Sequence, residues 1–187
     1  IARYTGVHSV IFGTGAPADD HARLAKEGFS PLPPVALQRQ LMTPHGEDTA
    51  RFTVVRAAPG GMPEGRIQFC QHHTPQFVWQ PQWMQHENGA TGLNTVILCV
   101  ENPLETAQRY ARFTGLTVAG GGDVLHVDTS RPNICVLPRR QALHWNIDER
   151  RISHESCPVL ETTAQRFRNK VTALDFRHFP HRKSLEN

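Results

Sequence analysis

The chain has no long apolar run and no paired cysteines. None of its apolar stretches approaches the roughly 20 residues that a membrane-spanning helix needs, which excludes an integral helical membrane protein. Its four cysteines lie far apart without any Cys-x-x-Cys pair, so zinc-finger and thioredoxin spacings are absent. No charged-then-apolar leader is present either. We therefore expect a reduced protein in the cytoplasm.

A basic surface spread over the whole chain is also lacking. Lysine and arginine outnumber aspartate and glutamate by 20 to 17, and residues 139–187 hold ten basic residues against six acidic ones. Nucleic-acid binding needs a clustered basic stripe or a known binding module, and the sequence has neither. We expect no nucleic-acid partner and no membrane partner. Hydrophobic residues make up 39% of the chain, which is enough for a globular core.

What the sequence does contain is a strand, a helix and further strands in a fixed order. A β-branched and aromatic run predicts a strand at residues 6–13, and the pattern at residues 17–28 predicts a helix that begins at a proline and ends at a glycine. Residues 30–48 contain four prolines and predict an irregular strand with a loop. Clear strands follow at residues 51–56 and 66–71.

The same order then starts again. Residues 92–100 predict a strand of the same character as the first. Asn102 is placed to cap a helix that Gly115 ends, and strands are predicted at residues 124–128 and 133–137. The chain therefore contains an internal repeat of a strand, a proline-started helix and strands.

The repeat is lost in the C-terminal part of the chain. Apolar residues fall at helical spacing between residues 160 and 174, which predicts one amphipathic helix after Pro158. We divide the chain into a first module at residues 4–88, which includes a tryptophan-containing connector, and a second module at residues 89–140. Residues 141–187 form a basic C-terminal extension.

Three segments resemble the vicinal oxygen chelate superfamily, and glyoxalase-like domain proteins most closely: residues 6–10, 65–75 and 86–93. The resemblance covers roughly residues 4–138 and implies an α+β fold of tandem βαβββ modules whose sheets enclose a cleft. A helical C-terminal extension follows. Similar proteins carry a further module upstream, and the chain begins with Ile1 rather than methionine, so we expect an upstream module in the full protein.

The resemblance also implies a divalent metal, Mn, Fe, Ni or Zn, in the cleft. The matching ligand positions are His8 and Gln68 in the first module and Asn94 and Cys135 in the second. His8 is the usual residue type, whereas Gln68 and Cys135 stand where glutamate is usual, and Asn94 stands where histidine or glutamine is usual. Oxygen and imidazole ligands suit these metals.

Two histidines are candidate catalytic groups. His72 shares one strand face with Gln68 and Cys70, and His126 lies on a predicted inner strand of the second module. An imidazole that titrates near neutral pH can act as general base on an acidic C–H bond. For both residues the alternative is a hydrogen-bonded structural histidine.

The resemblance implies a glyoxalase-like protein that acts on a small molecule, as a metal-dependent lyase, isomerase or ring-cleaving dioxygenase. Because both carboxylate ligands are replaced, a metal-free protein that binds or sequesters a small molecule remains the alternative. Phe77, Trp79 and Trp83 either line an aromatic substrate pocket or pack the two modules together, and we favour packing. Exposed sheet edges of such modules often pair with another copy, so we expect a homodimer.

Overall fold

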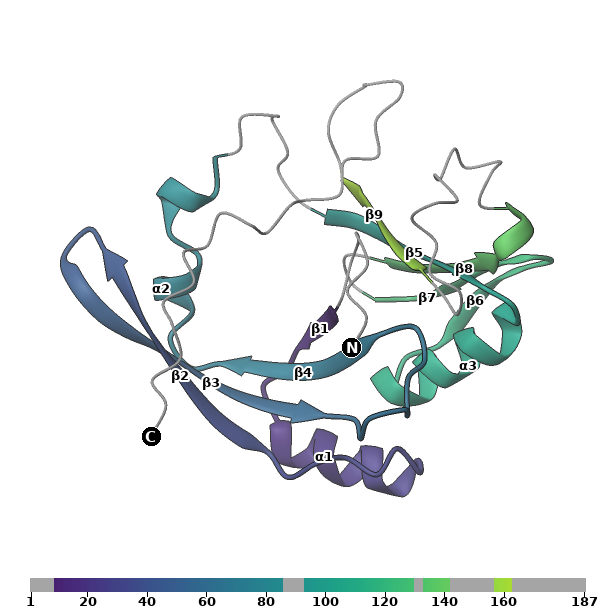
Figure 1. The fold of residues 1–187 in the computed structure, drawn as a ribbon, viewed down its shortest axis with the longest axis horizontal. Helices are drawn as coiled ribbons and strands as arrows, with labels where there is room; N and C mark the ends of the chain where they lie inside the picture. The colour runs from purple at the N-terminus through teal and green to yellow at the C-terminus, as the bar shows by residue number, and fades with distance from the viewer. Residues whose placement is uncertain (1–8, 86–92, 130–132, 142–156, 163–187) are drawn as a thin grey trace.

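The computed structural model of the protein describes residues 9–85, 93–129, 133–141 and 157–162. These residues form two β-sheets and two longer helices (Figure 1). None of the helices in the described ranges is long and apolar enough to cross a membrane.

The first sheet and its helices are built from residues 9–83. The elements are β1 (Ser9–Gly13), α1 (Pro17–Lys26), β2 (Val35–Thr43), β3 (Gly46–Arg56), β4 (Arg66–His72), α2 (Pro75–Val78) and the 3-10 helix η1 (Pro81–Trp83). The strands lie in the order β1-β4-β3-β2, with β1 parallel to β4 and the other pairs antiparallel. The proline-rich segment that predicted an irregular strand and a loop contains the regular nine-residue strand β2.

The second sheet repeats this topology. Its elements are β5 (Leu93–Val100), α3 (Pro103–Thr114), β6 (Val118–Gly121), β7 (Val124–Val127), β8 (Asn133–Pro138), the 3-10 helix η2 (Arg139–Gln141) and β9 (Cys157–Thr162). The strand order is β6-β7-β8-β5-β9, and β5 runs parallel to β8 as β1 does to β4. The predicted α+β fold and its internal βαβββ repeat are confirmed.

The limits of α3 follow directly from its sequence. The Asn102 side chain accepts a hydrogen bond from the backbone N–H of Glu105 at 3.2 Å, and Pro103 occupies the first turn. Gly115 ends the helix in a left-handed conformation, with φ of 76°, that costs glycine little. Both ends of this helix lie where its capping residues predict them.

The C-terminal segment differs from the prediction. Residues 157–162 form β9, an antiparallel partner of β5, so the helix predicted from residue 160 onward does not begin there. Pairing with the open edge of β5 satisfies backbone groups over long range, and this contact outweighs the local helical spacing. Proline suits such a position because β9 is the outermost strand of this sheet in the described part of the chain. Residues 163–174 of the predicted helix lie outside the described residues.

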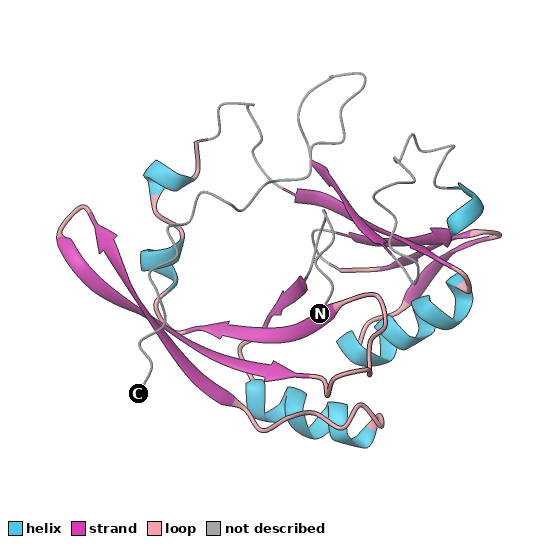
Figure 2. Cartoon of the chain, viewed as in Figure 1, coloured by secondary structure: helices cyan, strands magenta, loops and turns pink. Residues whose placement is uncertain are grey.

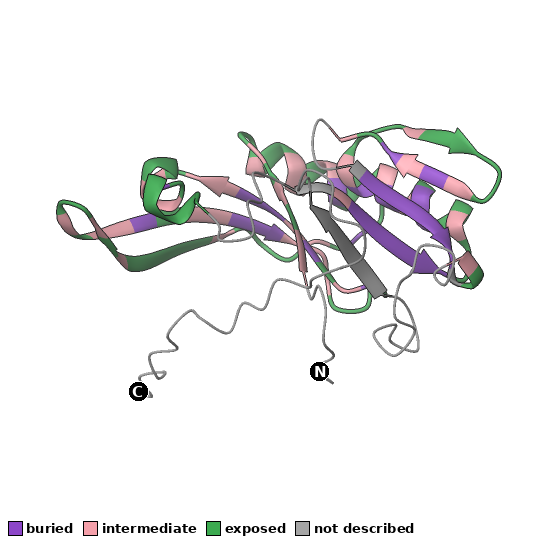
Figure 3. Cartoon of the chain, turned by 90° about the horizontal axis from the view of Figure 1, so that it is seen from above, coloured by how far each residue is buried: buried purple, intermediate pink, exposed green. Residues whose placement is uncertain are grey.

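One hydrophobic core joins the two modules. Phe113 of α3 is fully buried among Phe12 of β1, Phe69 of β4 and Phe29. Figure 3 shows buried stretches in the strands of both sheets, whereas strand β2 is largely exposed. The modules therefore stabilise each other through the helix of the second module.

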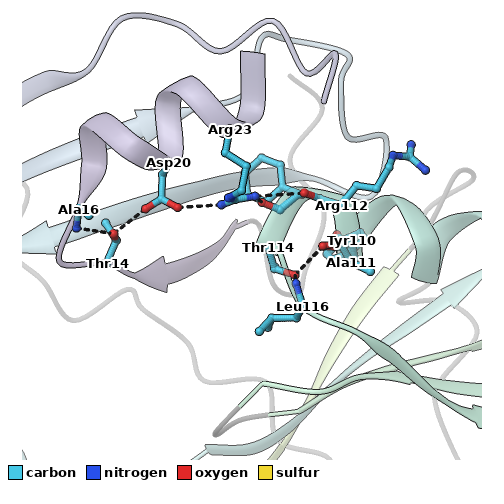
Figure 4. A network of polar contacts seen from close by, with 10 residues as sticks. Thr14, Ala16, Asp20, Arg23, Tyr110, Ala111, Arg112, Thr114 and Leu116 are labelled. Carbon is cyan, nitrogen blue, oxygen red and sulfur yellow. Dashed lines mark hydrogen bonds and ion pairs between the residues drawn. The ribbon is translucent and has the colours of Figure 1, made fainter. Parts of the chain in front are cut away.

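Two arginines add polar contacts to this core. Arg23 of α1 donates to the carbonyl oxygens of Arg112 and Phe113, at 3.1 and 2.6 Å, at the end of α3 (Figure 4). Arg109 of α3 forms a two-pronged ion pair with the buried Glu64, at 2.7 and 2.6 Å. Arg23 of the first module therefore provides hydrogen bonds to carbonyl groups that the last turn of α3 leaves without a helical partner.

Candidate functional site

Side chains of the first sheet alternate between two faces. Val10 and Phe12 of β1 and Ile67 and Phe69 of β4 pack into the same hydrophobic core as Leu24 of α1. Figure 2 shows α1 lying along one face of this sheet. The residues between them point to the opposite face of the sheet. We call this opposite face the Gln68 face, and it includes Ser9, Ile11, Gly13, Phe52, Val54, Arg56, Arg66, Gln68, Cys70 and His72.

The strand register places Gln68 between two different neighbours. Ile11 of β1 lies directly beside it on one side, and Arg56 of β3 lies directly opposite it on the other. Side chains in such positions have Cβ atoms about 4.5–5.5 Å apart. Gln68 therefore has a permanently charged residue, Arg56, as its cross-strand neighbour.

The Gln68 face contains three buried polar atoms without a partner. Ser9 Oγ, Arg56 Nε and His72 Nδ1 are shielded from solvent and have no hydrogen-bond partner in the described part of the chain. The great majority of buried polar atoms in proteins are paired, and each unpaired one costs about 1–3 kcal/mol. All three belong to residues on the same face of one sheet. This face therefore offers unused polar groups to a bound molecule.

Aromatic rings hold the imidazole of His72 in place. The ring of Phe52 meets it edge-on at a centroid distance of 5.1 Å, and the ring of Trp79 lies nearly parallel to it at 6.3 Å. Alternation along β4 places Gln68, Cys70 and His72 on one face, as predicted, while the next histidine, His73, contacts Thr53 at 2.8 Å. His72 thus has a fixed ring and a free nitrogen, Nδ1.

The tryptophan-containing connector lies against the first sheet. Trp79 follows α2 and contacts His72, and Gln80, which is buried, donates to the backbone carbonyl oxygens of Met42 and Phe77 at 3.3 and 2.8 Å. The indole of Trp79 remains 62% exposed, so it covers the edge of the candidate site.

The middle of the Gln68 face is apolar, and it is open along β1, where Ile11 is 54% exposed, whereas Cys70 and Val54 are buried. Cys70 lies between Val54 and Gly13, and a Cβ atom added at Gly13 would meet no atom within 4 Å. Burial raises the pKa of the Cys70 thiol, which keeps it protonated at neutral pH. This thiol is a small apolar group rather than a nucleophile.

The second module places two of its predicted residues side by side. His126 of β7 lies directly opposite Cys135 of β8, and Cys135 is buried beside Ile97 of β5. Asn94 belongs to β5, but only its backbone is described, and His8 lies outside the described residues. Gln68 and Cys135 belong to different sheets.

The described residues do not fit a divalent metal at Gln68. No group of three or more histidine, cysteine, aspartate or glutamate side chains that could hold a metal occurs in the described ranges. The neighbours of Gln68 are an isoleucine and an arginine, and a guanidinium repels a dication. The set of His8, Gln68, Asn94 and Cys135 as metal ligands stays a prediction.

Arg56 is the residue of this site that the sequence analysis missed. It ends β3, and its position opposite Gln68 depends on the length of the connection between β3 and β4. A strand pattern alone does not fix that register.

Comparison with known proteins identifies the family to which this chain belongs. A solved structure, the crystal structure of a hypothetical protein from Staphylococcus aureus, is similar with a TM-score of 0.53 at 11% sequence identity. The match covers 67% of this chain and 50% of the other, so this chain spans about half the length of that protein. A search among curated proteins found no match. A family model described as a glyoxalase-like domain matches residues 1–122, and the chain therefore belongs to the glyoxalase-like domain family.

Proposed function

We propose that this chain binds a small oxygen-bearing organic molecule on the Gln68 face and catalyses a proton transfer on it, as a lyase or isomerase does. The observation that carries the proposal is the presence of three buried, unpartnered polar atoms, Ser9 Oγ, Arg56 Nε and His72 Nδ1, on one sheet face. A bound molecule with oxygen atoms would complete the hydrogen bonds of Ser9 Oγ and Arg56 Nε and would bring a C–H group to His72 Nδ1. Membership of the glyoxalase-like family supports a small molecule as ligand.

His72 is the general base in this proposal. Its ring is held between Phe52 and Trp79, and Nδ1 has no partner in the described part of the chain, so the proton of a bound C–H group can move to it. Gln68 offers both a donor and an acceptor to substrate oxygens. These groups supply acid–base chemistry, and we therefore place proton transfer ahead of the oxygen activation that a ring-cleaving dioxygenase performs.

The first prediction concerns His72. His72→Phe keeps an aromatic ring between Phe52 and Trp79 and removes the base, so turnover should fall by about 100-fold or more while ligand affinity changes little. The reaction is followed as exchange of acidic C–H hydrogens for deuterium, by proton NMR in D2O, over a panel of small ketones, aldehydes and 2-oxo acids.

His73→Phe is the matched control, because His73 is the next residue along the chain and faces the other way. It should leave the exchange rate unchanged. An equal loss in His72→Phe and His73→Phe would contradict the assignment, and a loss only in His126→Phe would move the base to the second module. Binding without exchange by any member of the panel would favour the alternative function, sequestration of a small molecule.

A further inference from the structure

We propose that Arg56 binds a carboxylate group of the ligand, which makes small carboxylic acids with an apolar body the substrate class of this protein. The inference rests on the proposed function, because it requires that the Gln68 face is the binding site. It adds the charge and the orientation of the molecule that binds there.

Arg56 differs from Arg23 and Arg109, the two arginines that join the modules. Arg23 pairs with Asp20 at 2.7 Å, and Arg109 pairs with Glu64 at 2.6 Å. Among the described residues Arg56 has no acidic partner, and its Nε atom is buried without an acceptor. A half-buried guanidinium with an unused N–H group is costly unless an anion completes it.

The shape of the guanidinium selects the kind of anion. Its N–H groups form a planar fork that matches the two oxygens of a carboxylate, and such two-pronged pairs are stronger and more directional than a single hydrogen bond. Gln68, directly opposite Arg56, places an amide donor beside the same oxygens. Ser9, the other unpartnered donor at this end of the sheet, lies two residues before Ile11 on β1.

The remaining part of the face selects the body of the molecule. From Gln68 to His72 the strand β4 advances four residues, or about 13 Å at 3.3 Å per residue. Between these two residues Val54 and Cys70 are buried, and the exposed surface is that of β1, at Ile11 and Gly13. A ligand whose carboxylate contacts Arg56 thus lays an apolar body over Ile11 and Gly13 and extends toward the imidazole of His72.

The test compares a carboxylate with its uncharged amide. Isothermal titration with 3-phenylpropionate and with 3-phenylpropionamide should show that the wild-type protein prefers the acid. Arg56→Met keeps the aliphatic stem and removes the charge, so affinity for the acid should fall about 10- to 100-fold while affinity for the amide stays the same. Arg56→Lys should retain part of the preference. Arg51→Met, on the same strand and the opposite face, should change neither affinity.

A second variant separates this inference from the proposed function. Gly13→Val fills the open space beside Cys70, and Gly13 is not in a left-handed conformation, so the strand accepts valine without backbone strain. It should weaken both the acid and the amide. If Gly13→Val weakens binding and Arg56→Met does not, the face binds ligands but Arg56 is not the anchor. If neither variant changes binding, or the wild-type protein binds neither compound, the binding face itself is wrong.

Thermal unfolding distinguishes an anchor from a structural arginine. Because the Nε atom of Arg56 has no hydrogen-bond partner among the described residues, Arg56→Met should leave the melting temperature unchanged or raise it in the absence of ligand. A clear fall in melting temperature would mean that Arg56 supports the fold, which would overturn the inference. A stronger response of the wild-type protein to phenylphosphonate than to the carboxylate would also overturn it.

Discussion

Phe113→Ala should lower the free energy of unfolding by about 3–5 kcal/mol, the usual cost of removing a fully buried phenylalanine ring. Phe113 has no solvent exposure. Its ring stacks on Phe69 at 5.2 Å and meets Phe29 edge-on at 5.3 Å. Both partners belong to the first module, whereas Phe113 is on the helix of the second. Its removal therefore opens a cavity where the modules join.

Urea unfolding followed by circular dichroism measures this change. Leu104→Ala is the matched control on the same helix, because Leu104 is 55% exposed and its truncation should cost less than about 0.5 kcal/mol. Loss of the module contact should also broaden the Phe113→Ala transition, since each module then unfolds more independently. A cost for Phe113→Ala as small as that for Leu104→Ala would show that the modules do not share this core.

Arg109→Met should be about as destabilising, by roughly 3–5 kcal/mol, because it leaves the buried carboxylate of Glu64 without its counter-charge. The Glu64 side chain is 4% exposed, and its two oxygens accept from Arg109 at 2.6 and 2.7 Å. Removing one partner of such a pair costs more than removing both. The double variant Glu64→Leu with Arg109→Met should therefore recover most of the lost stability.

Glu105 provides the internal comparison for this pair. It also accepts from Arg109, at 2.8 Å, but its side chain is 52% exposed, so Glu105→Gln should cost less than about 1 kcal/mol. The hydrogen bond from Arg109 lowers the pKa of the Glu105 carboxyl. A carboxyl group whose pKa is lower in the folded than in the unfolded protein stabilises the fold. This stabilisation is fully present at a pH above the ordinary pKa of glutamate, and it is lost as the pH falls through the lowered pKa. If the double variant Glu64→Leu with Arg109→Met were no more stable than Arg109→Met alone, the ion pair between Glu64 and Arg109 would be contradicted.

Local sequence signals predicted the parts of the fold that depend on neighbours along the chain. Asn102 and Gly115 gave the two ends of α3, and the alternation of Gln68, Cys70 and His72 placed them on one strand face. Long-range pairing was not predictable in this way. β9 pairs with β5 across a gap of more than fifty residues, and its partner strand rather than its own pattern decides its conformation.

The candidate site was predicted in part for the same reason. The family resemblance pointed to Gln68, and alternation brought His72 to the same face. The role of Arg56 could not be predicted, because its position opposite Gln68 depends on the connection between β3 and β4. The pattern of residues within a strand does not determine that register. Because of this register, Gln68, which the resemblance implies as a metal ligand, has the permanently charged Arg56 as its cross-strand neighbour.

The central claim is that small molecules bind on the Gln68 face of the first sheet. Two-dimensional 1H–15N NMR of the whole chain, titrated with 3-phenylpropionate, tests it most directly. We expect saturable shifts of the backbone amides of Ile11, Arg56, Gln68 and His72, which surround the three unpartnered atoms. Shifts centred instead on His126 and Cys135, or no saturable shift at all, would contradict the claim.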